Sequence, residues 1–271
     1  MMDRIEEYQE KLKNEELTDS TVRLYVREAR FLLEWSGYNL RSKRQVIQYK
    51  KKLEDRYSVA TVNLKVIAVN RYLSFCGRPD WRLRQKKLQK SRSLETVITE
   101  TEYRVLEEYL LLTGQKKYYA ILKTLASTGI RVSELQYITV EHVRKGYAKI
   151  ENKGKVREIY ISDSLGRIVL GYCREAGISG GAVFCGNQGL PISRVAVWKK
   201  INQMAEKTGI PKEKLHPHSF RHYFALRYMD RYNNLFELAD ILGHSSLETT
   251  RIYLSSSIED KRRRLDDLAG V

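Results

Sequence analysis

The chain has 271 residues, of which 49 are lysine or arginine and 33 are aspartate or glutamate, so its formal net charge is +16. This length suits two domains, each with a core of its own that needs no disulfides. The cysteines Cys76, Cys173 and Cys185 are odd in number and form no CxxC pair, which argues against a secreted disulfide framework. No apolar run approaches the ~18 residues of a membrane span, and the N-terminus lacks a signal-peptide pattern. We therefore expect a cytoplasmic protein whose positive charge favours a polyanion, most commonly nucleic acid.

Residues 1–88 have the pattern of an all-helical domain. Apolar residues recur at spacings of three and four over residues 18–37, 41–57 and 58–77, which predicts three amphipathic helices packed through these stripes. A basic run from Arg71 to Arg92 then holds eight basic side chains against one acid. We assign residues 89–97 to a basic linker, which is either a solvated segment or one that lies along a DNA backbone.

Residues 98–271 combine helical and strand patterns. Helices are predicted near residues 99–111 and 118–127 and again after residue 193. Residues 147–150 and 157–161 predict a β-hairpin, because Gly154 between them permits a tight turn, and residues 182–185 predict a third strand. A short charged helix is expected near the C-terminus, at residues 258–268. The predicted fold is therefore mainly α with a small β-sheet: an all-helical N-terminal domain followed by an α+β domain.

Two segments near the C-terminus carry side chains suited to handling a phosphate. His218 and Arg221 stand three residues apart, which places them on one face of a helix, and His244 precedes Tyr253 by nine residues. His218 and His222 have the i,i+4 spacing of some zinc ligands, but no HExxH motif or nearby cysteine completes a metal site. The two segments thus supply a guanidinium, imidazoles and a phenol, but they contain no carboxylate pair and no set of metal ligands.

These segments and two stretches upstream resemble the tyrosine recombinase (phage integrase, Xer-like) family in order and spacing, over about residues 98–268. The N-terminal helices resemble that family's core-binding domain more loosely. The matching motifs are Thr128-Gly-Ile-Arg131-Val-Ser-Glu134-Leu135, the hairpin lysine Lys153, His218-Ser-Phe-Arg221, Leu242-Gly-His244 and Tyr253.

The resemblance implies a role for each residue. Tyr253 is the expected nucleophile, forming a 3′-phosphotyrosyl bond that stores the cleaved linkage without ATP or metal, so no cofactor is expected. Two arginines suit the charge on the non-bridging oxygens, because guanidinium stays charged and matches phosphate oxygens; these are Arg131 and Arg221. Lys153 is the expected general acid, with Lys155 as its competitor.

The remaining polar residues have supporting roles in this interpretation. His218 and His244 are expected to hydrogen-bond non-bridging oxygens, with His218 also able to take the tyrosyl proton, while a structural role stays open for His244. Glu134 resembles the acid that orients Arg131. His216 and His222 have no role in the resemblance and are interpreted as structural.

The family also implies the partners and the reaction. We expect a site-specific recombinase acting on double-stranded DNA through a Holliday junction, as a homo-tetramer on paired sites and a monomer off DNA, with accessory proteins possible. The C-terminal helix either packs on a neighbouring protomer or is solvated. With no arm-binding domain before the first helix, the chain resembles the shorter, resolvase-, invertase- or Xer-like members. The alternatives are a type IB topoisomerase and a non-catalytic DNA-binding protein of the same fold.

Overall fold

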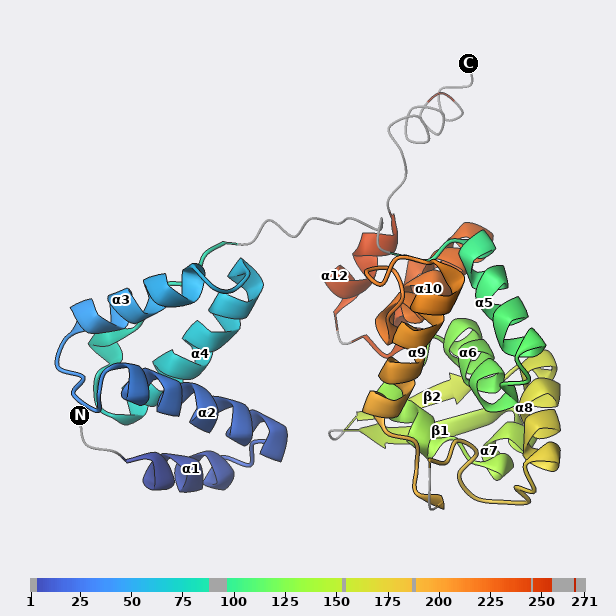
Figure 1. Cartoon of the computed structure of the whole chain (residues 1–271), viewed down its shortest axis with the longest axis horizontal. Helices are drawn as coiled ribbons and strands as arrows, with labels where there is room; N and C mark the ends of the chain where they lie inside the picture. Colours follow the sequence, from blue (N-terminus) through green and yellow to red (C-terminus); the bar gives the residue numbers. More distant parts are fainter. Residues whose placement is uncertain are drawn as a thin grey trace. The chain divides into compact units, whose positions relative to one another are not determined.

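The structure, a computed structural model, describes residues 4–87, 97–152, 155–186, 189–244, 246–254 and 266. The chain divides into two compact units, Met1–Ser91 and Arg92–Val271. Each is described by itself below, with elements labelled as in Figure 1.

The amino-terminal unit is built from helices alone within its described residues. They are α1 (Ile5–Asn14), α2 (Asp19–Trp35), α3 (Lys43–Glu54), α4 (Val59–Phe75) and the short 3-10 helix η1 (Pro79–Trp81). Ser42 starts α3 with a capping box to Gln45, and Ser58 caps α4. The predicted stripes do form the core: Leu32, Val46 and Val66, one from each predicted helix, are fully buried.

The basic segment after α4 packs back onto its own unit as far as residue 87. Asn70 on α4 exchanges two hydrogen bonds with the backbone of Leu83 (2.8 and 2.9 Å), and Asn63, two turns earlier, does the same with Lys86 (2.8 and 3.0 Å). The side chain of Leu83 is buried in the core. The first part of the basic run is therefore held by α4 and does not act as a linker. Most of the expected linker, residues 89–96, lies outside the described residues.

The carboxy-terminal unit is mainly helical with a small sheet, which confirms the predicted fold class (Figure 1). Helix α6 packs against α5, α8 and α10. In chain order, the elements are α5 (Glu100–Leu112), α6 (Lys116–Thr128), η2 (Val132–Tyr137), α7 (Val140–Lys145), β1 (Tyr147–Asn152), β2 (Lys155–Tyr160), α8 (Asp163–Glu175), α9 (Arg194–Thr208), α10 (Pro217–Tyr232), α11 (Leu235–Leu242), α12 (Leu247–Thr250) and η4 (Arg251–Leu254).

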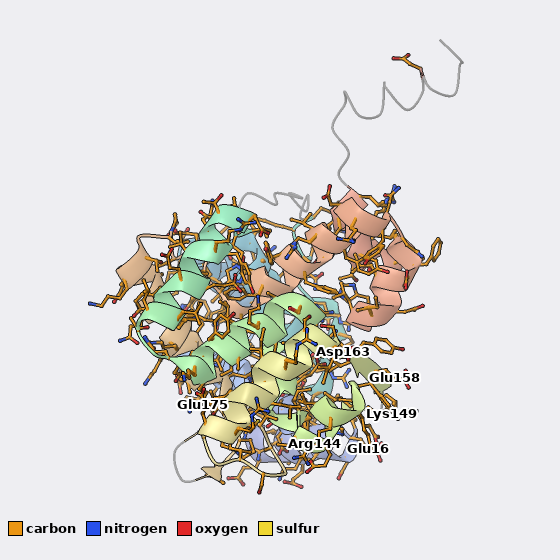
Figure 2. The ribbon with its side chains drawn as sticks, turned by 90° about the vertical axis from the view of Figure 1, so that its right-hand side faces the viewer. Glu16, Arg144, Lys149, Glu158, Asp163 and Glu175 are labelled. Carbon is orange, nitrogen blue, oxygen red and sulfur yellow. The ribbon has the colours of Figure 1, made fainter. Side chains whose placement is uncertain are left out.

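The sheet is a two-stranded antiparallel hairpin of β1 and β2, in a register that pairs Tyr147 with Tyr160. Figure 2 shows Lys149 and Glu158, which oppose each other across the hairpin and form an ion pair at 3.2 Å. The prediction of a third strand at residues 182–185 is wrong, because Ala182 and Cys185 make only isolated bridges, to Thr139 and Pro191. The hairpin turn with Lys153, and the expected C-terminal helix apart from residue 266, lie outside the described residues.

Candidate active site

Arg221 is the buried centre of a cluster of polar side chains. It lies on α10 with 1% of its surface exposed. Its Nη1 donates to the carbonyl of Gly129 and its Nη2 to the carbonyl of Leu242, both at 2.6 Å, which joins α10 to the ends of α6 and α11. Burial and the neighbouring charges of Arg131 and Arg157 lower the pKa of Arg221 to about 9, so the guanidinium stays charged at neutral pH.

Arg131 lies where α6 has ended and η2 begins. Gly129 closes α6 in a left-handed conformation (φ +59°), and a side chain there would meet Phe224 at 2.6 Å. Glu134, which is 1% exposed, accepts from the backbone N–H of Arg131 at 2.9 Å and from its Nη1 at 3.0 Å. Glu134 therefore holds both the backbone and the guanidinium of Arg131. The Arg131 side chain remains 40% exposed and can meet a ligand.

The structure adds a third arginine, Arg157 on β2, that the sequence analysis did not select. Its side chain is 8% exposed, its Nη1 donates to the carbonyl of Leu242 at 2.7 Å, and the same nitrogen lies 3.4 Å from Glu134. Among the described residues, its Nε and Nη2 have no hydrogen-bond partner. Gly243 makes room for it, because a Cβ at that position would lie 2.7 Å from Arg157 Cδ.

The cluster has an excess of positive charge. Arg131 and Arg157 each lower the pKa of Arg221 through their charge, so the three guanidinium groups lie within electrostatic reach of one another. The one carboxylate that forms an ion pair with them in the described part of the chain is Glu134, so three cations against one anion leave a net charge of +2. Grouping like charges at a partly buried place is unfavourable unless an anion joins them. The arrangement therefore fits an anionic ligand such as a phosphate.

His244 is held beside the arginines by the turn after α11. Its backbone N–H donates to Ala239 at 3.0 Å, and its Nδ1 lies 2.8 Å from the hydroxyl of the fully buried Thr250. Burial, followed by the charges of Arg221 and the other two arginines, lowers the pKa of His244 to about 4, which makes the imidazole neutral at pH 7. With Nδ1 engaged by Thr250, Nε2 is the ring nitrogen left to face a ligand.

Tyr253 lies in η4, 6% exposed, against apolar residues of α10 and α11. Burial raises the pKa of its phenol to about 12, and the Arg221 charge opposes that rise, which places the phenol in the field of the cluster. Its hydroxyl makes a 2.6 Å hydrogen bond with Nδ1 of His222. His218 packs against His222 edge to face with ring centroids 4.5 Å apart, and its pKa is lowered by burial and by Arg221.

The other residues considered from the sequence fall outside this cluster or serve the fold. His216 caps α10, accepting from the N–H of Ser219 at 3.0 Å, which agrees with the structural role expected for it. Lys153 lies outside the described residues. Lys155 is the first residue of β2, next to that turn.

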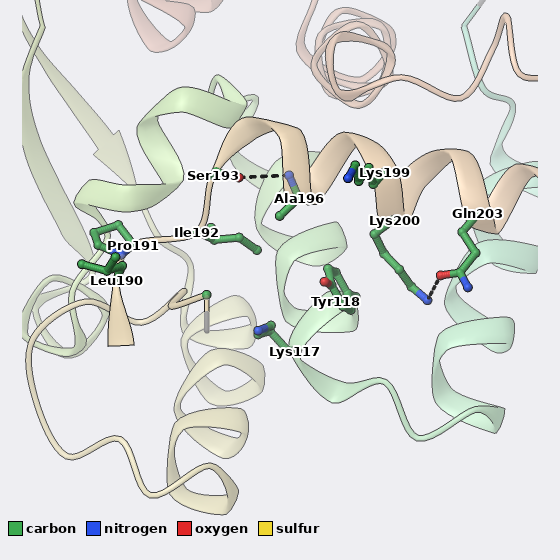
Figure 3. Close-up of a pocket in the computed structure, with 11 residues that line it drawn as sticks. Lys117, Tyr118, Leu190, Pro191, Ile192, Ser193, Ala196, Lys199, Lys200 and Gln203 are labelled. Carbon is green, nitrogen blue, oxygen red and sulfur yellow. Dashed lines mark hydrogen bonds between the residues drawn. The ribbon is translucent and has the colours of Figure 1, made fainter. Parts of the chain in front are cut away.

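Elsewhere in the unit, a hollow of about 630 Å³ lies beside α6 and α9 (Figure 3). Two of its three lysines are already engaged: Lys117 donates to the carbonyl of Cys185 and Lys200 to Gln203. Across the described ranges, no group of His, Cys, Asp or Glu is arranged to hold a metal ion. No helix within the same ranges combines the length and apolar character that crossing a bilayer requires.

Comparison with known proteins shows what kind of protein carries this site. The model of the phage integrase family matches residues 96–259. The tyrosine recombinase XerA of Pyrococcus furiosus is 30% identical over 92% of this chain and 88% of its own length. The chain therefore belongs to the phage integrase family of tyrosine recombinases, as the motifs indicated. It is a DNA strand-transferase, an enzyme of DNA recombination and integration.

Solved structures share the fold. A Tn1549 transposon integrase in complex with circular intermediate DNA superposes with a TM-score of 0.77 at 16% identity, covering 97% of this chain and 99% of that one. A lambda integrase dimer bound to a core site gives 0.73 at 17% identity, covering 93% and 94%.

Proposed function

We propose that this enzyme is a site-specific recombinase that cleaves and rejoins duplex DNA through a 3′-phosphotyrosyl intermediate, with Tyr253 as nucleophile. The observation that carries the proposal is that Tyr253 packs against α10, the helix that carries Arg221, and bonds His222, the residue next to Arg221. Nucleophile and anion site thus belong to one chain. An attacked phosphate between them gains negative charge in the transition state, which the excess cations stabilise.

The cluster supplies what each step of the reaction needs. The Tyr253 oxygen attacks phosphorus, the bond to the 5′-oxygen breaks, and the 3′-phosphate becomes esterified to tyrosine. Arg131 and Arg221 hold the non-bridging oxygens, and His244 donates to one of them from Nε2. Lys153 gives its proton to the leaving 5′-oxygen. When a 5′-hydroxyl later attacks the phosphotyrosyl bond, each proton returns, so ligation needs no energy-rich cofactor.

The proposal extends to the assembly on DNA. The helical amino-terminal unit serves as the core-binding domain, and its basic surface holds the duplex through phosphate contacts. A homo-tetramer brings two sites together, and sequential strand exchange passes through a Holliday junction. The fold neighbours solved with DNA, including a XerH recombinase bound to its difH substrate, support duplex DNA as the partner.

A nicked suicide substrate tests the nucleophile. The duplex is first selected from a random pool by binding to the wild-type protein. It carries a nick beside the cleavage point, so the short fragment that is released with a free 5′-hydroxyl diffuses away and cannot be rejoined. The wild-type protein is expected to accumulate a covalent protein–DNA adduct that survives denaturation. Tyr253→Phe, which removes only the hydroxyl, is expected to bind the duplex equally and form no adduct. An adduct that persists in this variant contradicts the assignment.

A second assay separates recombination from its alternatives. Two copies of the selected site on one plasmid are expected to yield recombinant products and, transiently, four-way junctions. Relaxation of supercoils without exchange indicates topoisomerase activity. Binding without either product indicates a DNA-binding protein that does not turn over.

A sulfur substitution tests the general acid. A 5′-bridging phosphorothiolate has a thiolate leaving group, which needs no proton because thiols are much more acidic than alcohols. Lys153→Ala is expected to cleave ordinary DNA about 10²- to 10⁴-fold more slowly and to recover nearly wild-type cleavage on the sulfur substrate. Lys155→Ala is the matched control, and recovery confined to that variant moves the role to Lys155.

A further inference from the structure

The closest polar contact of the proposed nucleophile involves a histidine to which the sequence gave no role. The Tyr253 hydroxyl and His222 Nδ1 are 2.6 Å apart, and the two rings lie 5.5 Å apart at an interplanar angle of 55°. A separation of 2.6 Å is at the short end for a hydrogen bond. No other hydrogen bond to this hydroxyl is formed by the described residues.

The direction of this bond follows from the protonation states. Burial raises the pKa of Tyr253 to about 12, so the phenol keeps its proton at neutral pH. Burial, the two histidines His216 and His218, and Arg221 lower the pKa of His222 to about 4, so its ring is neutral. The phenol O–H therefore donates to Nδ1, and the ring proton of His222 resides on Nε2.

His218, the residue expected from the motif to take this proton, lies one turn earlier on α10. Its ring meets His222 edge to face, and in the described part of the chain it forms neither a ring contact nor a hydrogen bond with Tyr253. Helical spacing does not separate the two histidines, because residues three and four apart share one side of a helix. They differ in the turn of α10 that they occupy, and it is the later one, His222, whose ring reaches the Tyr253 hydroxyl.

We propose that His222 is the proton acceptor for Tyr253: its Nδ1 takes the phenolic proton as the tyrosine oxygen bonds to phosphorus. This inference rests on the proposed function of the site. The step balances, because His222 gains the proton that Tyr253 loses while the general acid gives one to the 5′-oxygen. In the reverse step His222 returns the proton to the departing tyrosine. His218 is then left to hydrogen-bond a phosphate oxygen.

Bound DNA makes His222 a better base than it is in the free protein. The charged and titratable groups that act on it in the free protein are His216 and His218 on its own helix, Arg221, and the Tyr253 phenol. Arg221, the permanent cation among them, opposes protonation. A phosphodiester bound by the arginines offsets their charge, which raises the pKa of His222 toward the working pH.

The experiment compares two substitutions at this position in single-turnover cleavage of the nicked duplex. His222→Asn retains a side-chain oxygen near the Nδ1 position that can still accept from the phenol, but it is not basic. His222→Ala removes the contact entirely. Both are expected to lower the cleavage rate by about 10²- to 10⁴-fold with unchanged DNA binding. His218→Asn on the same helix is the matched control and is expected to retain more activity.

Three results overturn the proposal. A wild-type rate in His222→Asn means that the hydrogen bond only positions the phenol. Faster cleavage in His222→Ala means that the contact restrains Tyr253 in a resting state. A larger loss in His218→Asn than in His222→Asn gives the role to His218. An absence of adduct in the wild-type protein is a different failure, that of the proposed function itself.

A more acidic nucleophile provides the positive test, because a restored cleavage rate cannot come from a variant that fails to fold. A fluorinated tyrosine incorporated only at position 253 ionises near neutral pH and needs no base. In His222→Asn, this analogue is expected to restore cleavage at least tenfold relative to ordinary tyrosine, while adding little in the wild-type background. No restoration in a variant whose thermal unfolding is unchanged refutes proton transfer to His222.

Discussion

Replacing Arg157 with methionine is expected to separate stability from activity. The side chain is buried, makes one hydrogen bond to Leu242 and one ion pair to Glu134, and leaves two N–H groups without a partner in the described part of the chain. Methionine has a similar length and no charge. Its introduction leaves no orphaned acceptor, because Arg221 still donates to Leu242 and Arg131 still bonds Glu134.

The magnitude follows from these contacts. A hydrogen bond from a charged group contributes about 1.5–3 kcal/mol, whereas each buried donor without a partner costs about 1–3 kcal/mol. With two such donors and two neighbouring cations, the Arg157→Met exchange is expected to leave the free energy of unfolding unchanged or raise it by about 1 kcal/mol. For a unit of this size, that corresponds to a rise in Tm of about 2–4 °C.

Activity is expected to move the other way. Removing Arg157 reduces the charge of the cluster from +2 to +1, so a phosphate in its transition state loses stabilisation. A 10- to 100-fold slower single-turnover cleavage is expected, equivalent to about 1.4–2.7 kcal/mol. Arg157→Lys, which keeps the charge, is expected to lose less. A fall in Tm of more than about 5 °C with unchanged cleavage would show that Arg157 only supports the fold, and would refute this reasoning.

Two further outcomes are expected. Gly243→Ala should destabilise the carboxy-terminal unit by about 2 kcal/mol or more and slow cleavage, because φ is +62° and the new Cβ meets Arg157; Gly209→Ala, with φ +72° and open space, should show the backbone strain alone in thermal unfolding. Acid should weaken the fold, because His222 and His244 have pKa values of about 4 in the folded chain and near 6.5 when unfolded, so the unfolded chain binds protons first. Above pH 6.5 both histidines are neutral in the folded and the unfolded chain, so they do not change the free energy of unfolding. As the pH falls toward 4, the free energy of unfolding decreases by up to about 3 kcal/mol for each histidine. Urea unfolding at pH 7 and pH 4.5 measures this loss, and a pH dependence that is unchanged when both histidines are replaced by asparagine would contradict it.

Much of the fold follows from local sequence patterns. Stripes at helical spacing predicted α2, α3 and α4 within a few residues, whereas α1 was not among the three predicted helices. The third strand failed for a physical reason: Pro191, the partner of Cys185, has no backbone N–H with which to extend a ladder. The two asparagines of α4 that hold the basic segment gave no signal, because their bonds depend on where the chain returns.

In the candidate site, too, some residues could be predicted from local sequence patterns, whereas others depend on contacts made only in the folded chain. Arg131, Arg221 and His244 were predicted from the family resemblance of their motifs, and the structure places the three side chains in one cluster. Arg157 had a signal that went unused: it stands two residues before the buried Ile159, so the alternation of a strand places both on the same face of β2. His222 had none, since its contact with a residue 31 positions later exists only in the folded chain.

Whether Tyr253 carries the cleaved strand is tested most directly by mapping the covalent adduct. The wild-type protein is trapped on the nicked duplex and digested with protease and nuclease, and the peptide that retains a nucleotide is sequenced by mass spectrometry. We expect one modified peptide, with Tyr253 esterified to a 3′-phosphate and a free 5′-hydroxyl on the released fragment. A nucleotide on any other residue, or a linkage through a 5′-phosphate, would contradict the proposed chemistry.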